Sequence, residues 1–227
     1  MTKIICGIQQ MGIGVPNVQS IWKWYREHFG VDVRIFEEAA EAPLMTRYTG
    51  DKVHARTATL ALSMEGGGGF EIWQFTSRPT EKSTEPIILG DFGLYACRIK
   101  SKDVRKTYDF FKKKGVTILS EPQQLPNGQL HFMIVDPNGN LFDIVEGSGW
   151  FMNTSFEGQT GGVAGSMIGV SSIENALPLY QKILGYDKIV YDITDTFDGF
   201  NSIPNGNHKI RRVLLEHTEA RKGPFAK

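Results

Sequence analysis

The stretch MGIGVPNVQSIWKWYREHFGVDV, residues 11–33, decides the fold, because it combines a short strand, a helix, a glycine and a second strand. Its helix is indicated by apolar residues that recur at steps of three and four, namely Val18, Ile21, Trp22, Tyr25 and Phe29. Asn17 can accept a hydrogen bond from a backbone N–H of the first turn, and Gly30 can adopt the left-handed conformation that ends a helix. The stretch therefore predicts a strand–helix–strand unit whose helix ends are fixed locally.

Two further copies of this pattern follow along the chain. LYACRIKSKDVRKTYDFFKKKGVTIL occupies residues 94–119, and SMIGVSSIENALPLYQKILGYDKIV occupies residues 166–190. Positions 15, 25 and 30 of the first copy carry the same residue types as positions 170, 180 and 185, each 155 residues later. Such a repeat predicts a chain built from similar units.

Each of the first two copies is followed by a hairpin. Residues 53–63 alternate between polar and apolar side chains, and a four-glycine run at 66–69 joins them to residues 70–75, which predicts two strands with a flexible turn. In the second copy, residues 136–139 read Asp-Pro-Asn-Gly, a type I turn signal. Residues 37–52 are charged and predict a loop or flap. The expected order in each unit is a strand, a helix and three strands.

The third unit differs from the others in two respects. Pro178 lies inside its predicted helix, where it removes a backbone hydrogen bond and predicts a kink or a late start. Phe225 is the counterpart of Phe70, so the last strand of this unit would begin where the sequence ends. We therefore expect an incomplete third unit, in a fragment of a longer, four-unit chain. The expected modules span residues 1–78, 91–148 and 162–227.

Composition excludes several classes of function. The chain has 25 Lys and Arg against 25 Asp and Glu, so it lacks the positive excess that nucleic acids and anionic membranes attract. No apolar run approaches the roughly 18 residues of a membrane-spanning helix, and no signal peptide precedes residue 11. Two cysteines, Cys6 and Cys97, are too few for a disulfide framework. They predict buried free thiols in a reducing cytoplasm.

The motifs GIGVPNV, WYREHFGV and IVDPNGNLFDIVE together resemble the vicinal oxygen chelate superfamily, which comprises glyoxalases, bleomycin-resistance proteins and extradiol dioxygenases. The resemblance implies an α+β fold of tandem βαβββ modules, of which the first two pair into a cupped mixed β-sheet that encloses a pocket. It also implies a small-molecule ligand. In the metalloenzymes of this superfamily, the first and last strands of each module hold a divalent metal.

The resemblance assigns the metal-ligand positions of this chain residue by residue. In the first module they fall on Gln10 and Glu71, and in the second on Leu94 and Asp143, whereas the third module offers Gly165. Leucine cannot bind a metal. The oxygen donors Gln10, Glu71 and Asp143 would suit Mg²⁺ or Mn²⁺ better than Zn²⁺, with Fe²⁺ also open, although no cofactor is required by the sequence.

Further candidates concern catalysis and substrate binding. Glu71 can act as a metal ligand or a general base, or pair with a nearby arginine, and Trp73 shares its strand face as a candidate aromatic pocket wall. Arg98 can bind a substrate carboxylate in place of the missing metal, or form a salt bridge to Glu71 or Asp143.

Histidines supply the remaining candidates. His131 shares a strand face with Met133 and Val135, which favours a side chain that points inward. His54 and Arg56 share one face of an alternating strand, where Arg56 can hold an anionic substrate while His54 moves a proton. The alternative for this pair is an exposed polar face.

Two functions fit these residues. One is a protein that binds a small oxygenated or aromatic compound at a degraded metal site. The other is a divalent-metal-dependent lyase, isomerase or dioxygenase of the same superfamily. A partner chain, for example in a homo-oligomer, is expected to cover the open edge of the third module.

Overall fold

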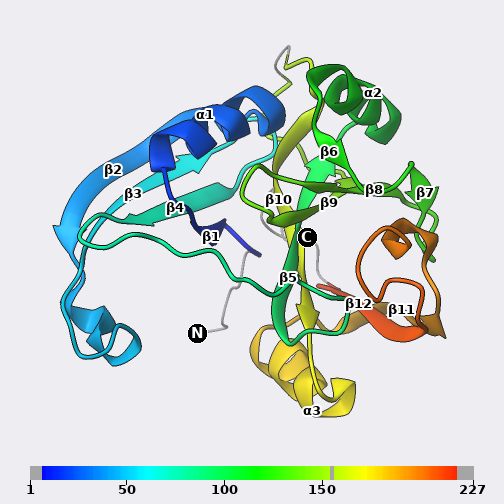
Figure 1. Cartoon of the computed structure of the whole chain (residues 1–227). Helices are drawn as coiled ribbons and strands as arrows, with labels where there is room; N and C mark the ends of the chain where they lie inside the picture. Colours follow the sequence, from blue (N-terminus) through cyan, green and yellow to red (C-terminus); the bar gives the residue numbers. More distant parts are fainter. Residues whose placement is uncertain (1–6, 154–155, 219–227) are drawn as a thin grey trace, which may run out of the picture.

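The computed structural model describes residues 7–153 and 156–218 of the 227-residue chain (Figure 1). The first unit contains β1 (Gln10–Gly14), α1 (Val18–Phe29), β2 (Val33–Glu41), a 3₁₀ helix η1 (Pro43–Tyr48), β3 (Ala55–Leu62) and β4 (Gly69–Phe75). Its strands form a four-stranded sheet, here the first sheet, in the order β1-β4-β3-β2. The pair β1–β4 is parallel and the other pairs are antiparallel.

The rest of the described chain forms two more sheets. The second unit contains β5 (Gly93–Ser101), α2 (Val104–Lys114), β6 (Thr117–Ile118), β7 (Gln123–Gln124), β8 (Leu130–Val135) and β9 (Leu141–Glu146). The third contains β10 (Thr160–Gly169), α3 (Ile173–Pro178), a π-helix η2 (Leu179–Ile183), β11 (Lys188–Asp195), a 3₁₀ helix η3 (Asp198–Phe200) and β12 (Ile210–Glu216). The second sheet has the order β10-β5-β9-β8-β6, with β7 beside β8, and the third sheet is β11-β12. The predicted α+β class is confirmed, with mixed sheets that stay open.

The helix boundaries follow from the residues that cap them. The side chain of Asn17 accepts a hydrogen bond of 2.8 Å from the backbone N–H of Ser20, and Gly30 ends α1 with φ of 65°. Asp103 caps α2 in the same way, and Gly115 ends it with φ of 72°. In the third unit, α3 ends at Pro178 and the chain continues as a π-helix, so the helix is irregular at the proline while a kink or a late start stays a prediction.

Two sequence predictions need correction. Residues 37–52 are not simply a loop, because β2 continues to Glu41 by pairing with β3, and η1 follows it. The glycine run is not a flexible tip either, since a Cβ on Gly66 would lie 1.6 Å from the carbonyl oxygen of Gly161. The hairpin is therefore packed against β10 of the third unit. Residues 1–6, including Cys6, lie outside the described residues.

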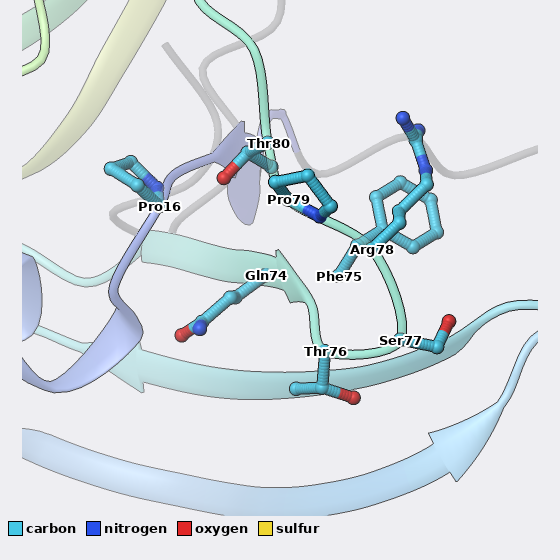
Figure 2. Close-up of a pocket in the computed structure, with 8 residues that line it drawn as sticks. All are labelled: Pro16, Gln74, Phe75, Thr76, Ser77, Arg78, Pro79 and Thr80. Carbon is cyan, nitrogen blue, oxygen red and sulfur yellow. The ribbon is translucent and has the colours of Figure 1, made fainter.

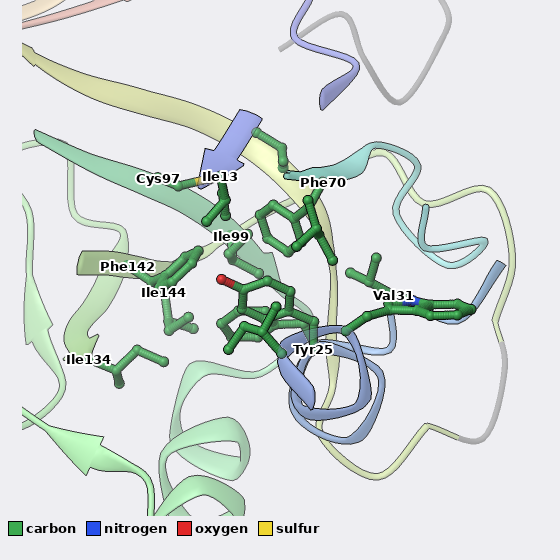
Figure 3. Packing of buried hydrophobic residues seen from close by; sticks show 14 of the residues in the cluster. Ile13, Tyr25, Val31, Phe70, Cys97, Ile99, Ile134, Phe142 and Ile144 are labelled. Atoms are coloured by element: carbon green, nitrogen blue, oxygen red, sulfur yellow. The ribbon is translucent and has the colours of Figure 1, made fainter. Parts of the chain in front are cut away.

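Units one and two share one hydrophobic core. Helices α1 and α2 cover it, and its largest fully buried side chains include Tyr25, Phe29, Phe70, Phe111 and Phe142 (Figure 3). These rings belong to both units, and the centroids of Phe29 and Phe142 are 5.0 Å apart. Burial of this aromatic surface joins the first and second sheets.

A second core attaches the third unit. Phe200 and Ile203, which follow β11, pack against Tyr95, Met133 and Leu141 of the second unit. Strand β10 pairs antiparallel with β5 along nearly its whole length, and the two strands lie side by side in Figure 1. The edge strand of the second sheet, next to β5, is thus β10 of the third unit.

Strands β1 and β12 each lie at the edge of a sheet, which is relevant to the predicted module boundaries. Within the described residues, β1 pairs only with β4 and β12 only with β11. Residue 225, where the repeat places the counterpart of Phe70, lies outside those residues. The module boundaries and the cover of the third module's open edge stay predictions.

Candidate functional site

The candidate site is a cavity of about 990 Å³ between the second and third sheets. One wall comes from β5 and β10, which contribute Tyr95, Arg98 and Gly165. The other walls come from α3, η2 and the β11–β12 hairpin, with Tyr180 and Arg212 among the lining residues. The cavity exists because β10 continues the second sheet while the hairpin, attached through the second core, stands opposite it.

Asp143 is the centre of the polar part of this site. Its side chain is fully buried, and its Oδ1 lies 2.7 Å from Nδ1 of His131. Its Oδ2 accepts a hydrogen bond of 3.0 Å from Nε of Arg98. The parallel register of β5 and β9 sets Arg98 directly opposite Asp143, so the strand pairing itself forms this ion pair. The third sheet contributes a second guanidinium. Nη2 of Arg212 lies 3.8 Å from the same Oδ2.

The charge state of Asp143 follows from these neighbours. Burial opposes ionisation, but His131 and Arg98, with Arg212 further away, hold the pKa of the carboxyl well below its usual range. The carboxylate is therefore charged at neutral pH.

Arg212 is the site residue that sequence reasoning missed. Its guanidinium carbon lies 5.3 Å from the ring centroid of Phe200 and 5.5 Å from that of Phe197. Burial lowers its pKa, while Tyr191 and Asp143 act in the opposite direction. The alternation of Ile210, Arg212 and Leu214 along β12 was the available signal, because period two sets these residues on one strand face.

The predicted residues of the first unit form a separate group on the first sheet. Nε2 of Gln10 donates a hydrogen bond of 2.6 Å to one oxygen of Glu71, and Nε1 of Trp73 donates one of 3.0 Å to the other. The guanidinium of Arg56 lies 5.1 Å from the Trp73 ring centroid and pairs with Glu38. Glu71 is thus held by Gln10 and Trp73 rather than by an arginine.

The remaining candidates fall in different surroundings. His131 is buried, as predicted from its strand face, and joins the Asp143 group. Nδ1 of His54 lies 3.0 Å from Oγ of Ser77, away from the cavity lining. Leu94 is 66% exposed at the start of β5. The contacts among the described residues thus bring Arg98, His131 and Asp143 together, and join Glu71 to neither His131 nor Asp143.

The donor set does not fit a divalent metal at the cavity. Both oxygens of Asp143 already contact His131 and Arg98, and a cation there would meet the guanidiniums of Arg98 and Arg212. In the first unit, Gln10 and Glu71 supply one amide and one carboxylate. Across residues 7–153 and 156–218, no three His, Cys, Asp or Glu side chains gather in a metal-binding group.

A second depression lies at the end of β4 (Figure 2). It has a volume of about 440 Å³, and its lining runs mainly from Gln74 to Thr80, with Arg78 as the one charged residue of the lining. Arg78 lies over the Phe75 ring at 4.4 Å, and Gln74 accepts a hydrogen bond from the backbone N–H of Val18. These contacts cap α1 and cover an aromatic ring, so this open groove gathers no reactive groups.

Solved structures share this arrangement of elements. Glyoxalase I from Zea mays is 18% identical, with a TM-score of 0.52 over 93% of this chain and 67% of that one. A candidate dioxygenase from Bacillus subtilis is 14% identical, with a TM-score of 0.56 over 95% of this chain and 70% of that one. A glyoxalase family protein from Bacillus cereus is 16% identical, with a TM-score of 0.52 over 64% of this chain and 95% of that one. At these identities the similarity establishes the fold.

The fold defines the class first: an α+β protein with few helices and several open β-sheets. The sequence profile of one family matches residues 7–144, which is more than half of the chain. The chain belongs to the Glyoxalase/Bleomycin resistance protein/Dioxygenase superfamily. No curated protein matches it. None of the helices in the described residues is both long and apolar enough to cross a membrane.

Proposed function

We propose that this chain binds a small, partly aromatic, oxygenated molecule in the cavity between the second and third sheets. The observation that carries this proposal is a cavity of about 990 Å³ that combines an apolar wall with a few converging polar groups. Tyr180, Tyr186 and Leu214 provide apolar surface, and Arg98 and Arg212 provide hydrogen-bond donors. Sites for small organic molecules typically have this composition.

The ligand is proposed to bind without a metal, at a degraded metal site. Leu94 and Gly165, which the family resemblance places at ligand positions, have no donor atom in their side chains. Asp143, which occupies the ligand position in the last strand of the second module, is engaged by Arg98 and His131. In this proposal, the guanidinium of Arg98 takes the place of the metal cation.

Ligand-observed NMR with small aromatic compounds, such as benzamide and phenylacetamide, tests the cavity. We expect saturation transfer to these rings in the wild-type protein and its loss in Gly165→Trp. An added Cβ at Gly165 meets only Cδ of Arg98, at 3.7 Å, so a larger side chain would enter the cavity. Gly12→Trp is the matched control, since Gly12 lies in β1, outside the cavity. Transfer that persists in Gly165→Trp would overturn the proposed binding site.

Metal titration separates this proposal from the alternative, a divalent-metal-dependent lyase, isomerase or dioxygenase. A metal at a hundredfold excess over its Kd would stabilise the protein by about 2.7 kcal/mol. We expect no thermal shift between EDTA and Mn²⁺, Fe²⁺ or Zn²⁺. Stoichiometric metal that is lost in Glu71→Ala would instead support the metalloenzyme.

We also propose a partner chain and a cellular compartment. The edge of β12 that faces away from β11 carries no strand among the described residues, so a second chain is proposed to cover it. Sedimentation of the purified protein would show a single-chain mass if this is wrong. The free thiol of Cys97 favours a reducing cytoplasm.

A further inference from the structure

Two buried guanidiniums that line the cavity share a single carboxylate, that of Asp143, which is fully buried. Arg98 uses Nε to bond Oδ2 of Asp143 at 3.0 Å, and Nη2 of Arg212 lies 3.8 Å from the same oxygen. The other oxygen of Asp143 faces His131. Whichever protonation state His131 adopts, this group of four side chains carries a net positive charge.

Each guanidinium has a nitrogen without a partner. Nη2 of Arg98 and Nη1 of Arg212 are buried and have no hydrogen-bond partner among the described residues. The side chains are only 9% and 10% exposed, respectively, so water solvates them poorly. The hydroxyl of Tyr95, also in the cavity lining, is likewise buried and unpaired within the described part of the chain. Buried donors of this kind are costly unless a partner satisfies them.

The carboxylates at the edge of the cavity are already engaged elsewhere. Glu216 pairs with Lys188 at 3.2 Å, and Glu174 pairs with Arg211. Asp91 accepts a hydrogen bond of 3.0 Å from the backbone N–H of Ile88, and Glu146 accepts one from that of Leu130. None of these contacts involves Arg98 or Arg212.

The same wall of the cavity carries another cation. Lys100, two residues from Arg98 on β5, is buried, donates to the carbonyl of Gly149 at 2.9 Å and lies over the Trp150 ring at 5.3 Å. It adds to the positive potential on this face of the sheet. The inner part of the cavity is therefore positive and rich in donors.

We propose that Arg98 and Arg212 form a subsite for the carboxylate of the ligand, which makes the ligand an aromatic or apolar carboxylic acid. This inference rests on the proposed small-molecule function and names its ligand class. Two guanidiniums from opposite walls can each donate to one carboxylate oxygen, and such charge-assisted hydrogen bonds are short and strong. The apolar body of the acid then lies against Tyr180, Tyr186 and Leu214, which line the same cavity.

Calorimetric titration of phenylacetate against its neutral isostere, phenylacetamide, tests the subsite. We expect phenylacetate to bind about 10- to 100-fold more tightly, the range that hydrogen bonds to charged groups provide. Phenylphosphate serves as a third probe, because a phosphate presents a different charge and shape to the same donors. Its binding more tightly than phenylacetate would overturn the assignment to a carboxylate.

Arg212→Gln is the informative variant, because it leaves the ion pair of Arg98 with Asp143 in place. We expect it to reduce phenylacetate affinity at least about tenfold and phenylacetamide affinity by a much smaller factor, because only the acid loses a charge-assisted hydrogen bond. Arg211→Gln is the matched control, since the adjacent Arg211 also lines the cavity but already pairs with Asp192, at 2.8 Å, and with Glu174. Circular dichroism spectra of both variants establish that the fold is retained.

The outcomes separate the two proposals. If acid and amide bind equally in the wild type, or if Arg211→Gln weakens phenylacetate as much as Arg212→Gln does, the carboxylate subsite is wrong while the cavity remains a binding site. If neither compound binds and Gly165→Trp changes nothing, the proposed function fails as well.

Discussion

Arg212 and Asp143 lie on different sheets, yet Nη2 of one is 3.8 Å from Oδ2 of the other. Arg212 comes from β12 of the third unit and Asp143 from β9 of the second, so the contact joins the two sheets. It exists because β10 extends the second sheet and the Phe200 segment attaches the β11–β12 hairpin to it. The set of charged groups around Asp143 thus depends on the assembly of both units.

Asp143→Asn should strongly destabilise the protein at neutral pH. Loss of its charge leaves Arg98 buried without its partner, and breaking a buried pair typically costs about 3–5 kcal/mol. Asp192→Asn is the control, because its pair with Arg211 is exposed and should contribute little. Urea unfolding at pH 7 measures the difference, and equal midpoints for the two variants would contradict the ion-pair role.

The same carboxylate predicts an acid dependence. Its folded-state pKa lies well below the ordinary value of 3.8, so its contribution to the free energy of unfolding is present above that value. It is lost as pH falls through the folded pKa. The gap between wild type and Asp143→Asn should therefore shrink below about pH 4. A gap that stays constant from pH 7 to pH 3 would show that Asp143 does not titrate in this way.

Tyr25→Phe should destabilise the shared core of units one and two. The Tyr25 hydroxyl donates a hydrogen bond of 2.7 Å to Asp136, in the turn between β8 and β9. Hydrogen bonds to charged groups contribute about 1.5–3 kcal/mol. Tyr108→Phe is the control, since its hydroxyl bonds Glu121 at the surface.

The stability difference between wild type and Tyr25→Phe should change with pH in the opposite direction to the difference for Asp143→Asn. Burial, with Asp136 close by, raises the pKa of Tyr25 well above 10, so its contribution is complete below pH 10 and declines as pH rises towards the folded pKa. Unfolding measured at pH 8 and pH 11 should show the wild-type advantage over Tyr25→Phe decreasing. An unchanged advantage would argue against a buried neutral phenol.

Gly66→Ala should destabilise the contact between the glycine run and β10. An added Cβ would lie 1.6 Å from the carbonyl oxygen of Gly161, and backbone cannot move aside as a flexible side chain can. Overpacking of this kind costs about 1–3 kcal/mol or more. Gly12→Ala is the matched control, because nothing lies within 4 Å of its added Cβ. Similar thermal midpoints for the two variants would contradict the packed hairpin.

The thiol of Cys97 should be inert in the native protein. Burial raises its pKa, as does the nearby charge of Asp143, and the reactive thiolate is therefore scarce. In a Cys6→Ser background, a thiol reagent such as dithionitrobenzoate should label nothing at pH 8 and one thiol per chain in urea. Rapid labelling without denaturant would show that β5 opens readily.

The sequence alone determined the local features. Asn17, Gly30, Asp103 and Gly115 fix where α1 and α2 begin and end, because capping depends on neighbouring backbone groups. The repeat and its motifs gave the family, since they reflect the order of the elements. Period two predicted inward side chains for Arg98 and His131, and both are buried beside Asp143.

Only the tertiary structure decided which of these side chains meet. No local pattern states that β5 pairs with β10, or that Arg212 lies beside Asp143, because such contacts join residues far apart in sequence. Strand pairing and the burial of Phe200 bring Arg212 to the site, while Glu71 stays with Gln10 on another sheet. The sequence specifies the residue types, but the packing decides which charged side chains lie close together in the site.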